Sequence, residues 1–569
     1  MYIEHVPNRN SPPAVLVRES YRENGKVKKR TLANLTGLPD DVIAAVAAVL
    51  AGYQIVPCGQ GFTTVQTTPH GHVHALLTTL RRIGLDDLIA SKPCRERSII
   101  MALIVERLLH GTSKLAATRL WHTTTLADEL GLAQVGVNEV YAAMDWLVAR
   151  QERIEKKLAG RHLGEGSALY YDLSSSYYEG QHCPLAQYGY SRDGKRGLPI
   201  IEYGVMTDRC GRPLAISVYE GGTSDCETVA DQLERVRTQF GLKRVVFVGD
   251  RGMLTEMQIK TVKTHPGLGW VSALRATAIQ KLAQSGALQM SLFDQRNLAE
   301  ITTPEYPGER LVVCYNPILA DDRKKSRAEL LAATEKDLEQ LRCRVARRTK
   351  TILTEAEIGV SAGARINRYK MSKHFSLQIG DGTFAWARKQ ASIDQEAALD
   401  GIYVIRTSEA AEHLSAADAV RAYKGLAETE RVFRGMKGVA NHVRPIFHRS
   451  DPRVRAHLFI SMLAYYLEWH LRDALTPLLF DDETRRAANA VRDPVAPAKP
   501  SPAARRKKVA RQTENGLPLH SLPTLLEDLG TVCRNVHELK IKKETVRIRN
   551  YTELTPLQAE VYRRLECSQ

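Results

Sequence analysis

Three residues spaced seven apart have side chains that could act together. Tyr423, Glu430 and Lys437 lie in the stretch RAYKGLAETERVFRGMK. If this stretch is one helix, a seven-residue step at about 100° per residue returns to within ~20° of its start, so the three share a face. Arg434 follows Glu430 at i+4, beside that face. An acid between a phenol and cations is either neutralised by its neighbours or held ready for a metal ion.

Two aspartates far upstream are candidates to join Glu430. A strand-like run in YYDLSSSYYEG ends in Asp172, and a second, in RVVFVGDRGM, ends at Asp250. Three carboxylates brought together repel one another unless cations lie among them, and two Mg²⁺ or Mn²⁺ ions about 3.5–4 Å apart are the usual solution. Such ions activate water or a 3′-hydroxyl and stabilise the leaving oxygen of a phosphodiester. The oxygen ligands, and a sequence without Cys/His clusters, favour Mg²⁺ over Zn²⁺.

The segments around these acids predict the elements that position them. Residues 166–275 read as strand, strand, strand, helix, strand, helix, strand. This order predicts an α/β protein with a ribonuclease H-like core, a mixed sheet flanked by helices, in which Asp172 and Asp250 lie side by side. Residues 276–400 interrupt the pattern with ERLVVCYNPIL, a long charged helix and alternating aromatic stretches, so we expect an inserted β-rich and helical subdomain. Residues 401–475, which begin within the strand-like run DGIYVIRTS, complete the core.

Other patterns flank this core. Residues 1–60 contain a predicted hairpin, with AVLVRESYRE and KVKKRTLANL joined by an Asn-Gly dipeptide that suits a tight turn. Residues 61–165 have apolar residues at helical intervals and predict a helical domain, which either binds DNA ends as a helix-turn-helix or only supports the core. Residues 476–569 contain a stretch rich in Ala, Pro, Lys and Arg, at 487–513, which predicts an unfolded basic linker before a C-terminal helical unit.

Composition favours a polyanionic partner. The 569 residues include 80 Lys+Arg and 64 Asp+Glu, a net charge of +16. Nucleic acid is the default partner, and an enzyme with a merely basic surface is the alternative. The apolar run SIIMALIV is too short to span a bilayer, so no membrane partner is expected. No secretory signal is expected from MYIEHVPNRN, and nine unpaired cysteines without a C-x-x-C motif favour the cytoplasm.

The motifs around the three acids carry a family resemblance. YYDLSSSYYEG, VFVGDRGM and RAYKGLAETERVFRGMK resemble the DDE transposases of bacterial insertion sequences, most closely the group with the signature Y-x2-R-x3-E-x6-K and a β-rich insertion before the glutamate. YGYSRDGKRGLP is similar to the segment that follows the first aspartate in that family. The resemblance covers most of residues 166–475. It implies cleavage and strand transfer of DNA at terminal inverted repeats, with Asp172, Asp250 and Glu430 as the catalytic, metal-binding triad.

The same resemblance implies how DNA is held. Tyr423 and Lys437 would contact backbone phosphates near the cleaved end. The signature's arginine falls on Leu426, so its phosphate contact is either missing or supplied by a neighbour. The candidate neighbours are Lys424, Arg431 and Arg434. A homodimer would join double-stranded transposon ends and target DNA at the bacterial nucleoid. Two other classes remain open: an inactive DNA-binding derivative or repressor, and a ribonuclease H-like nuclease without strand transfer.

Overall fold

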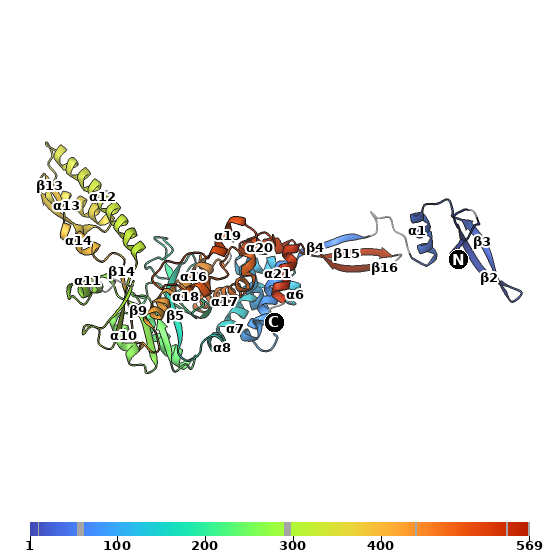
Figure 1. Ribbon diagram of the computed structural model, residues 1–569, viewed down its shortest axis with the longest axis horizontal. Coiled ribbons are helices and arrows are strands. Elements are labelled where there is room, and N and C mark those ends of the chain that lie inside the picture. The colour runs from blue at the N-terminus through green and yellow to red at the C-terminus, as the bar shows by residue number, and fades with distance from the viewer. Residues whose placement is uncertain (10, 54–61, 289–296, 439–440, 542–543, 567–569) are drawn as a thin grey trace. The chain divides into compact units, whose positions relative to one another are not determined.

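The computed structural model describes the whole chain except residues 10, 54–61, 289–296, 439–440, 542–543 and 567–569 (Figure 1). The chain divides into two compact units. The first contains Met1–Thr68 and Val532–Glu553, and the second contains Pro69–Thr531 and Leu554–Gln569. Among the helices that the structure describes, none combines the length and apolar character needed to span a bilayer.

The first unit confirms the predicted N-terminal hairpin. Strands β1 (Tyr2–Val6), β2 (Ala14–Glu23) and β3 (Lys26–Asn34) form an antiparallel sheet, followed by α1 (Asp40–Leu50). Asn24 and Gly25 both have positive φ, 50° and 76°, which places Glu23 opposite Lys26 as a two-residue turn requires. The unit also contains the antiparallel pair β15 (Cys533–Ile541) and β16 (Glu544–Tyr551) in a sheet with β4 (Thr63–Pro69). The C-terminal region, predicted as a helical unit, therefore also contains two strands.

The second unit begins with helices, as the apolar periodicity predicted. They are α2 (Gly71–Arg82), α3 (Leu85–Ile89), α4 (Arg95–Leu109), α5 (Lys114–Leu120), α6 (Leu126–Glu129), α7 (Val137–Val148) and α8 (Gln151–His162). The apolar run SIIMALIV lies in α4, and its residues from Ile99 onward are buried. This run is therefore a core helix, as its length indicated.

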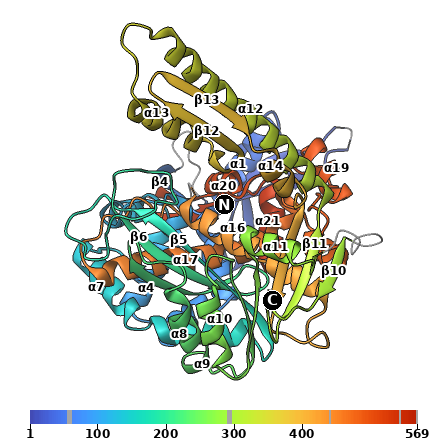
Figure 2. The ribbon, with the colours of Figure 1, turned by 90° about the vertical axis from the view of Figure 1, so that its left-hand side faces the viewer.

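An eight-stranded mixed sheet follows, and it confirms the predicted mixed α/β class (Figure 2). Its spatial order is β10-β11-β14-β9-β8-β5-β6-β7. The strands are β5 (Ser167–Tyr177), β6 (Ile200–Thr207), β7 (Pro213–Glu220), β8 (Val245–Val248), β9 (Leu268–Ala273), β10 (Leu298–Ile301), β11 (Arg310–Tyr315) and β14 (Ile402–Thr407). The pairs β5–β8 and β8–β9 are parallel and the others are antiparallel. Helices α9 (Thr228–Thr238) and α10 (Glu256–Lys263) connect the parallel strands.

Two details of the sheet differ from the prediction. Strand β5 continues past Asp172 to Tyr177, because β6 pairs with it from Tyr170 to the end. Strands β10 and β11 belong to the main sheet. Contrary to the prediction, the region just after α11 (Ala276–Gln284) is therefore not part of a separate subdomain. The chain between β11 and β14 has a core of its own. It contains α12 (Pro317–Arg347), α13 (Glu355–Arg368), β12 (Phe375–Gly380), β13 (Thr383–Arg388) and α14 (Gln390–Ala397).

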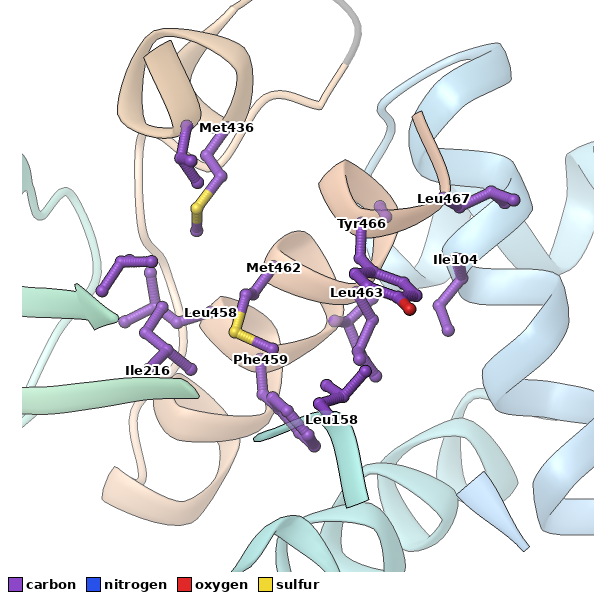
Figure 3. Packing of buried hydrophobic residues seen from close by; sticks show 14 of the residues in the cluster. Ile104, Leu158, Ile216, Met436, Leu458, Phe459, Met462, Leu463, Tyr466 and Leu467 are labelled. Atoms are coloured by element: carbon purple, nitrogen blue, oxygen red, sulfur yellow. The ribbon is translucent and has the colours of Figure 1, made fainter. Parts of the chain in front are cut away.

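Helix α17 (Asp451–Leu475) connects the helical region to the sheet. Residues 456–464 of α17 are all buried and mostly apolar, which is typical of a helix in the middle of a core. Figure 3 shows Phe459, Met462 and Leu463 of α17 packed among Ile104 of α4, Ile216 of β7 and Met436. Met436 belongs to α16 (Leu426–Lys437), which follows α15 (Ala416–Lys424). The helix of the candidate site is therefore held by the main core.

The basic stretch at 487–513 is not the unfolded linker that was predicted. It contains the end of α18 (Arg485–Val491) and all of α19 (Pro502–Ala510), ahead of α20 (Leu522–Gly530) and α21 (Pro556–Glu566). Neither α18 nor α19 has a buried residue. Polar contacts and the burial of the single side chain of Val495 in the apolar cluster beside α15 hold this segment, which is why its composition gave no sign of order.

Candidate active site

Asp172 and Asp250 occupy equivalent positions on neighbouring strands. The parallel register of β5 and β8 pairs Tyr170 with Val248, and each aspartate comes two residues later. Strand β8 ends at Val248, so Asp250 follows a strand end, as predicted, whereas Asp172 lies inside β5. Asp172 is half-buried and Asp250 is exposed. Neither carboxylate forms an ion pair with any residue that the structure describes.

The environment of Asp172 favours its protonated form. The pKa of Asp172 is raised to about 7, chiefly by burial, and the negative charge of Asp250 contributes to this rise. The backbone N–H of Leu173, which donates to Asp172 Oδ1 at 2.8 Å, and the positive charge of Arg192 oppose this shift of the pKa. A cation bound at the two aspartates would offset the cost of burying the charge of Asp172 and the repulsion between the two carboxylates. These are the electrostatic conditions for a metal site.

Helices α15 and α16 carry the other predicted residues, and they are not the single helix that was expected. Gly425 separates them while keeping helical dihedral angles, φ −61° and ψ −21°. A Cβ atom at Gly425 would lie 2.6 Å from the ring of Tyr170 on β5. The first turns of α16 therefore lie against β5 at the level of Tyr170, where Thr429 Oγ1 also lies 2.8 Å from Thr207 Oγ1, on the residue of β6 that pairs with Tyr170.

Glu430 lies alongside Asp172 along this sheet. One turn past Thr429, the ring of Phe433 packs against Tyr203 at a centroid distance of 5.8 Å, and Tyr203 pairs with Ser174 of β5. Between Thr429 and Phe433, α16 thus passes from the level of Tyr170 to that of Ser174, and Asp172 is midway. The Glu430 carboxylate is exposed and has no hydrogen bond or ion pair with the described residues.

The three acids do not form a ready metal centre in this conformation. Within the described ranges, no group of three or more His, Cys, Asp or Glu side chains is arranged to hold a metal ion. Tyr423 Oη donates to Asp250 Oδ1 at 2.8 Å, and burial together with the Asp250 charge raises the pKa of Tyr423. The structure thus brings Asp172 and Asp250 close together, with Tyr423 bound to Asp250, whereas the Glu430 carboxylate has no described contact with either aspartate. The chemistry of Asp172, Asp250 and Glu430 fits a hard cation, since all three are carboxylates that form no ion pair with a described residue.

Lys437 lies at the far end of α16, where all three protons of its ammonium are used. Its Nζ donates to Ser174 Oγ at 2.7 Å, Ser175 O at 2.6 Å and Asp193 Oδ1 at 2.8 Å. Its side chain is only 11% exposed. Burial lowers the pKa of Lys437, and the pairing with Asp193 opposes that shift. In this conformation Lys437 ties α16 to β5 and has no proton left for a phosphate.

Two residues that the sequence reasoning missed complete this region. Asp193 is buried and accepts hydrogen bonds at Oδ1 from both Lys437 and Arg444, the latter at 2.5 Å. Arg192 donates from its guanidinium to Leu173 O and Asp225. Both belong to YGYSRDGKRGLP, the segment singled out by resemblance, and its Arg-Asp pair was the available signal. They lie along the part of β5 that β8 no longer pairs.

The cations of α15 and α16 differ in their freedom to meet DNA. Arg431 pairs with Glu428 at 3.2 Å, and Lys424 donates to Val495 O at 3.2 Å. Arg434 is exposed, and its side chain has no partner among the described residues. Leu426, at the place of the signature's arginine, is buried in an apolar cluster. Of the three candidate replacements, Lys424, Arg431 and Arg434, it is Arg434 whose charged group is available to bind a phosphate.

Comparison with known proteins gives one family match. Residues 3–56 match the family described as IS1634 family transposase, N-terminal domain. No curated protein matches the sequence. Among solved structures, the chain is similar to one in a cryo-EM structure of the piggyBac transposase synaptic complex with hairpin DNA, with 9% identity and a TM-score of 0.34 over 83% of this chain and 81% of that chain. The match at residues 3–56 supports a transposase.

Proposed function

We propose that the protein is a DDE-type transposase that cleaves DNA at the terminal inverted repeats of an insertion sequence and joins the ends to a target. The observation that carries this proposal is the placement of Asp172 and Asp250 two residues past the paired Tyr170 and Val248, with the helix of Glu430 alongside. We assign the sheet to the ribonuclease H-like class, in which a hairpin precedes parallel strands, as β5, β6 and β7 precede β8 and β9.

Asp172, Asp250 and Glu430 are proposed to bind two Mg²⁺ or Mn²⁺ ions. Bound there, the ions would activate the attacking oxygen and stabilise the leaving oxygen of the phosphodiester. Asp172 must first release a proton, because burial raises its pKa to about 7. The unpaired Glu430 side chain is free to turn toward the aspartates. Tyr423 fixes the rotamer of Asp250 through its 2.8 Å hydrogen bond.

Double-stranded DNA, as transposon ends and as target, is the proposed substrate. Arg434 can take up a phosphate at once, whereas Arg431 and Lys437 must first give up an existing partner. Tyr423 can donate its hydroxyl proton to a phosphate only if its hydrogen bond to Asp250 is broken first. We further propose a homodimer that holds two ends in a synaptic complex, at the nucleoid of the bacterial cytoplasm.

Incubation with supercoiled DNA that carries candidate ends, in the presence of Mg²⁺, tests the proposal. Joined products are expected, and Asp172→Ala, Asp250→Ala or Glu430→Ala should each abolish cleavage while end binding in a gel shift persists. Asp418→Ala, which removes an exposed acid of α15, is the matched control and should cleave normally.

Each other outcome contradicts part of the proposal. Nicking without joined products would indicate a nuclease, and a gel shift without nicking would indicate an inactive DNA-binding derivative. Full cleavage by any one of the three alanine variants would remove that residue from the site.

A further inference from the structure

The basic segment after α17 is fixed to the helices of the candidate site. Arg485, at the start of α18, pairs with Glu428 of α16. Lys424 of α15 donates to Val495 O at 3.2 Å, and Arg421 donates to Arg492 O at 3.1 Å. Contacts from both α15 and α16 therefore hold this segment beside the residues proposed to act on DNA.

Helix α19 has its own anchors to the chain that follows α17. Ser501 caps the helix by accepting from Ala504 N, and its hydroxyl donates to Asp482 Oδ1 at 2.9 Å. Lys507 Nζ donates to Thr476 O at 2.8 Å and to Glu483 Oε1 at 3.0 Å. These contacts fix both the position of α19 and its rotation about its axis.

The remaining cations of α19 face away from that anchor. At about 100° per residue, Arg505, Arg506 and Lys508 fall on one arc, and Lys507 lies opposite the middle of that arc. All three are exposed, and their side chains have no partner among the residues that the structure describes. We call Arg505, Arg506 and Lys508 the α19 surface. Because α19 is anchored, the helix holds these three cations in place on its outer side. A flexible basic tail would not fix its charges in this way.

Nearby acids do not neutralise this surface. Residues 494–513 contain six Lys and Arg residues and no Asp or Glu. The acids closest to the anchors are already engaged, since Asp481 pairs with Arg472, Asp482 accepts from Ser501 and Glu483 pairs with Lys507. The charge of the α19 surface is therefore available to a polyanion.

We propose that the α19 surface binds the phosphate backbone of double-stranded DNA that runs past α16, independently of sequence. The proposal rests on the proposed function in so far as DNA is the substrate. Arg and Lys side chains that contact phosphates position a duplex without reading its bases, and they release counterions when they bind. The α19 surface would thus hold DNA outside the reacting bond while the carboxylates act on it.

The salt dependence of binding tests this role. Binding of the full-length protein to a duplex without transposon ends is measured by fluorescence anisotropy between 50 and 200 mM salt. The slope of log K against log salt should become shallower by about 2.7 in the triple variant Arg505→Ala, Arg506→Ala, Lys508→Ala, since each lost phosphate contact changes it by about 0.9. The charge-conserving variant Arg505→Lys, Arg506→Lys should keep the wild-type slope.

A charge-matched control separates this surface from net charge. Replacing the exposed Lys156, Lys260 and Lys281 with alanine removes three charges from α8, α10 and α11, and should leave the slope unchanged. An unchanged slope in the α19 variant, or an equal change in the control, would overturn the proposal. Thermal melting of each variant excludes misfolding.

Failure of this inference differs from failure of the proposed function. If the slope changes but the wild-type protein never cleaves DNA with transposon ends, the α19 surface stands and the transposase proposal falls. If cleavage occurs and the slope does not change, only the α19 surface is wrong.

Discussion

Replacing Asp172 with asparagine should stabilise the metal-free protein above pH 7. The pKa of Asp172 is raised from 3.8 to about 7, chiefly by burial. Between those two pH values the native state binds more protons than the unfolded chain, so the free energy of unfolding falls as pH rises. The stability that protonation of Asp172 provides is complete below about pH 4 and is lost above about pH 7. Asparagine has nearly the same shape and never carries the charge.

The size of this effect follows from the pKa shift. A shift of about 3 pKa units at about 1.4 kcal/mol each sets a ceiling of about 4 kcal/mol. Asp172 is only half-buried, so solvent screening lowers the expected gain in the free energy of unfolding to about 2 kcal/mol. For domains of 150–250 residues, about 1 kcal/mol corresponds to 2–4 °C in Tm. The second unit is larger than that, so we expect a rise of about 2–4 °C in total.

Thermal melting at pH 5 and pH 8, in EDTA and in Mg²⁺, measures this prediction. In EDTA the wild-type protein should lose more Tm between pH 5 and pH 8 than Asp172→Asn does. Because bound Mg²⁺ at 100 times its Kd stabilises by about 2.7 kcal/mol, Mg²⁺ should raise the Tm of the wild type at pH 8 and not that of Asp172→Asn. Glu202, whose pKa burial also raises to about 7, contributes equally to both proteins and cancels in the comparison.

Asp418→Asn is the control, since this exposed acid should change neither the pH response nor the Mg²⁺ response. If Asp172→Asn and the wild type show the same loss of Tm between the two pH values in EDTA, the argument from burial is wrong. If Mg²⁺ stabilises both proteins equally, Asp172 does not bind it.

Two further substitutions test the contacts between α16 and β5. Lys437→Met should lower Tm and cleavage more than DNA binding, because it leaves the buried Asp193 with only Arg444 as a cationic partner. Melting curves, cleavage assays and gel shifts on the same preparations check this. A variant that loses only DNA binding would show that Lys437 contacts phosphate instead. Gly425→Ala should lower the free energy of unfolding by about 1–3 kcal/mol, because its Cβ would lie 2.6 Å from the ring of Tyr170. Denaturant unfolding measures this loss. The double variant Gly425→Ala, Tyr170→Ala should lose less free energy of unfolding than the sum of the two single variants. Strict additivity of the two losses would contradict the clash.

Local patterns were sufficient for much of the fold. The Asn-Gly dipeptide determined the turn between β2 and β3, and the predicted order of strands and helices over residues 166–275 matches β5, β6, β7, α9, β8, α10 and β9. The runs that end near Asp172 and Asp250 predicted that the aspartates would be neighbours, and the parallel register of β5 and β8 agrees. These features depend on residues close together in the chain, where side-chain period and turn chemistry decide the outcome.

What could not be predicted depends on distant partners. Strand β5 continues beyond Asp172 because β6 pairs there, and nothing in YYDLSSSYYEG specifies that partner. The hydrogen bond of Lys437 to Asp193, 244 residues earlier in the chain, could not be predicted, and the phosphate contact of Lys437 stays a prediction. Strand β11 was placed in an insertion because helices follow it, but its pairing with β14 puts it in the main sheet. The roles of Asp172, Asp250 and Glu430 stay predictions.

The pairing of β11 with β14 also bears on how the chain can vary. Tyr315, the last residue of β11, is opposite Ile402, the first residue of β14, so the chain leaves the sheet and returns to it at the same rung. Residues 316–401 are in topological terms one long hairpin loop, and doubling the length of a flexible loop costs only about 0.6 kcal/mol of closure entropy. Natural variants could therefore lengthen, shorten or replace this excursion without shifting the register of a single strand beneath it.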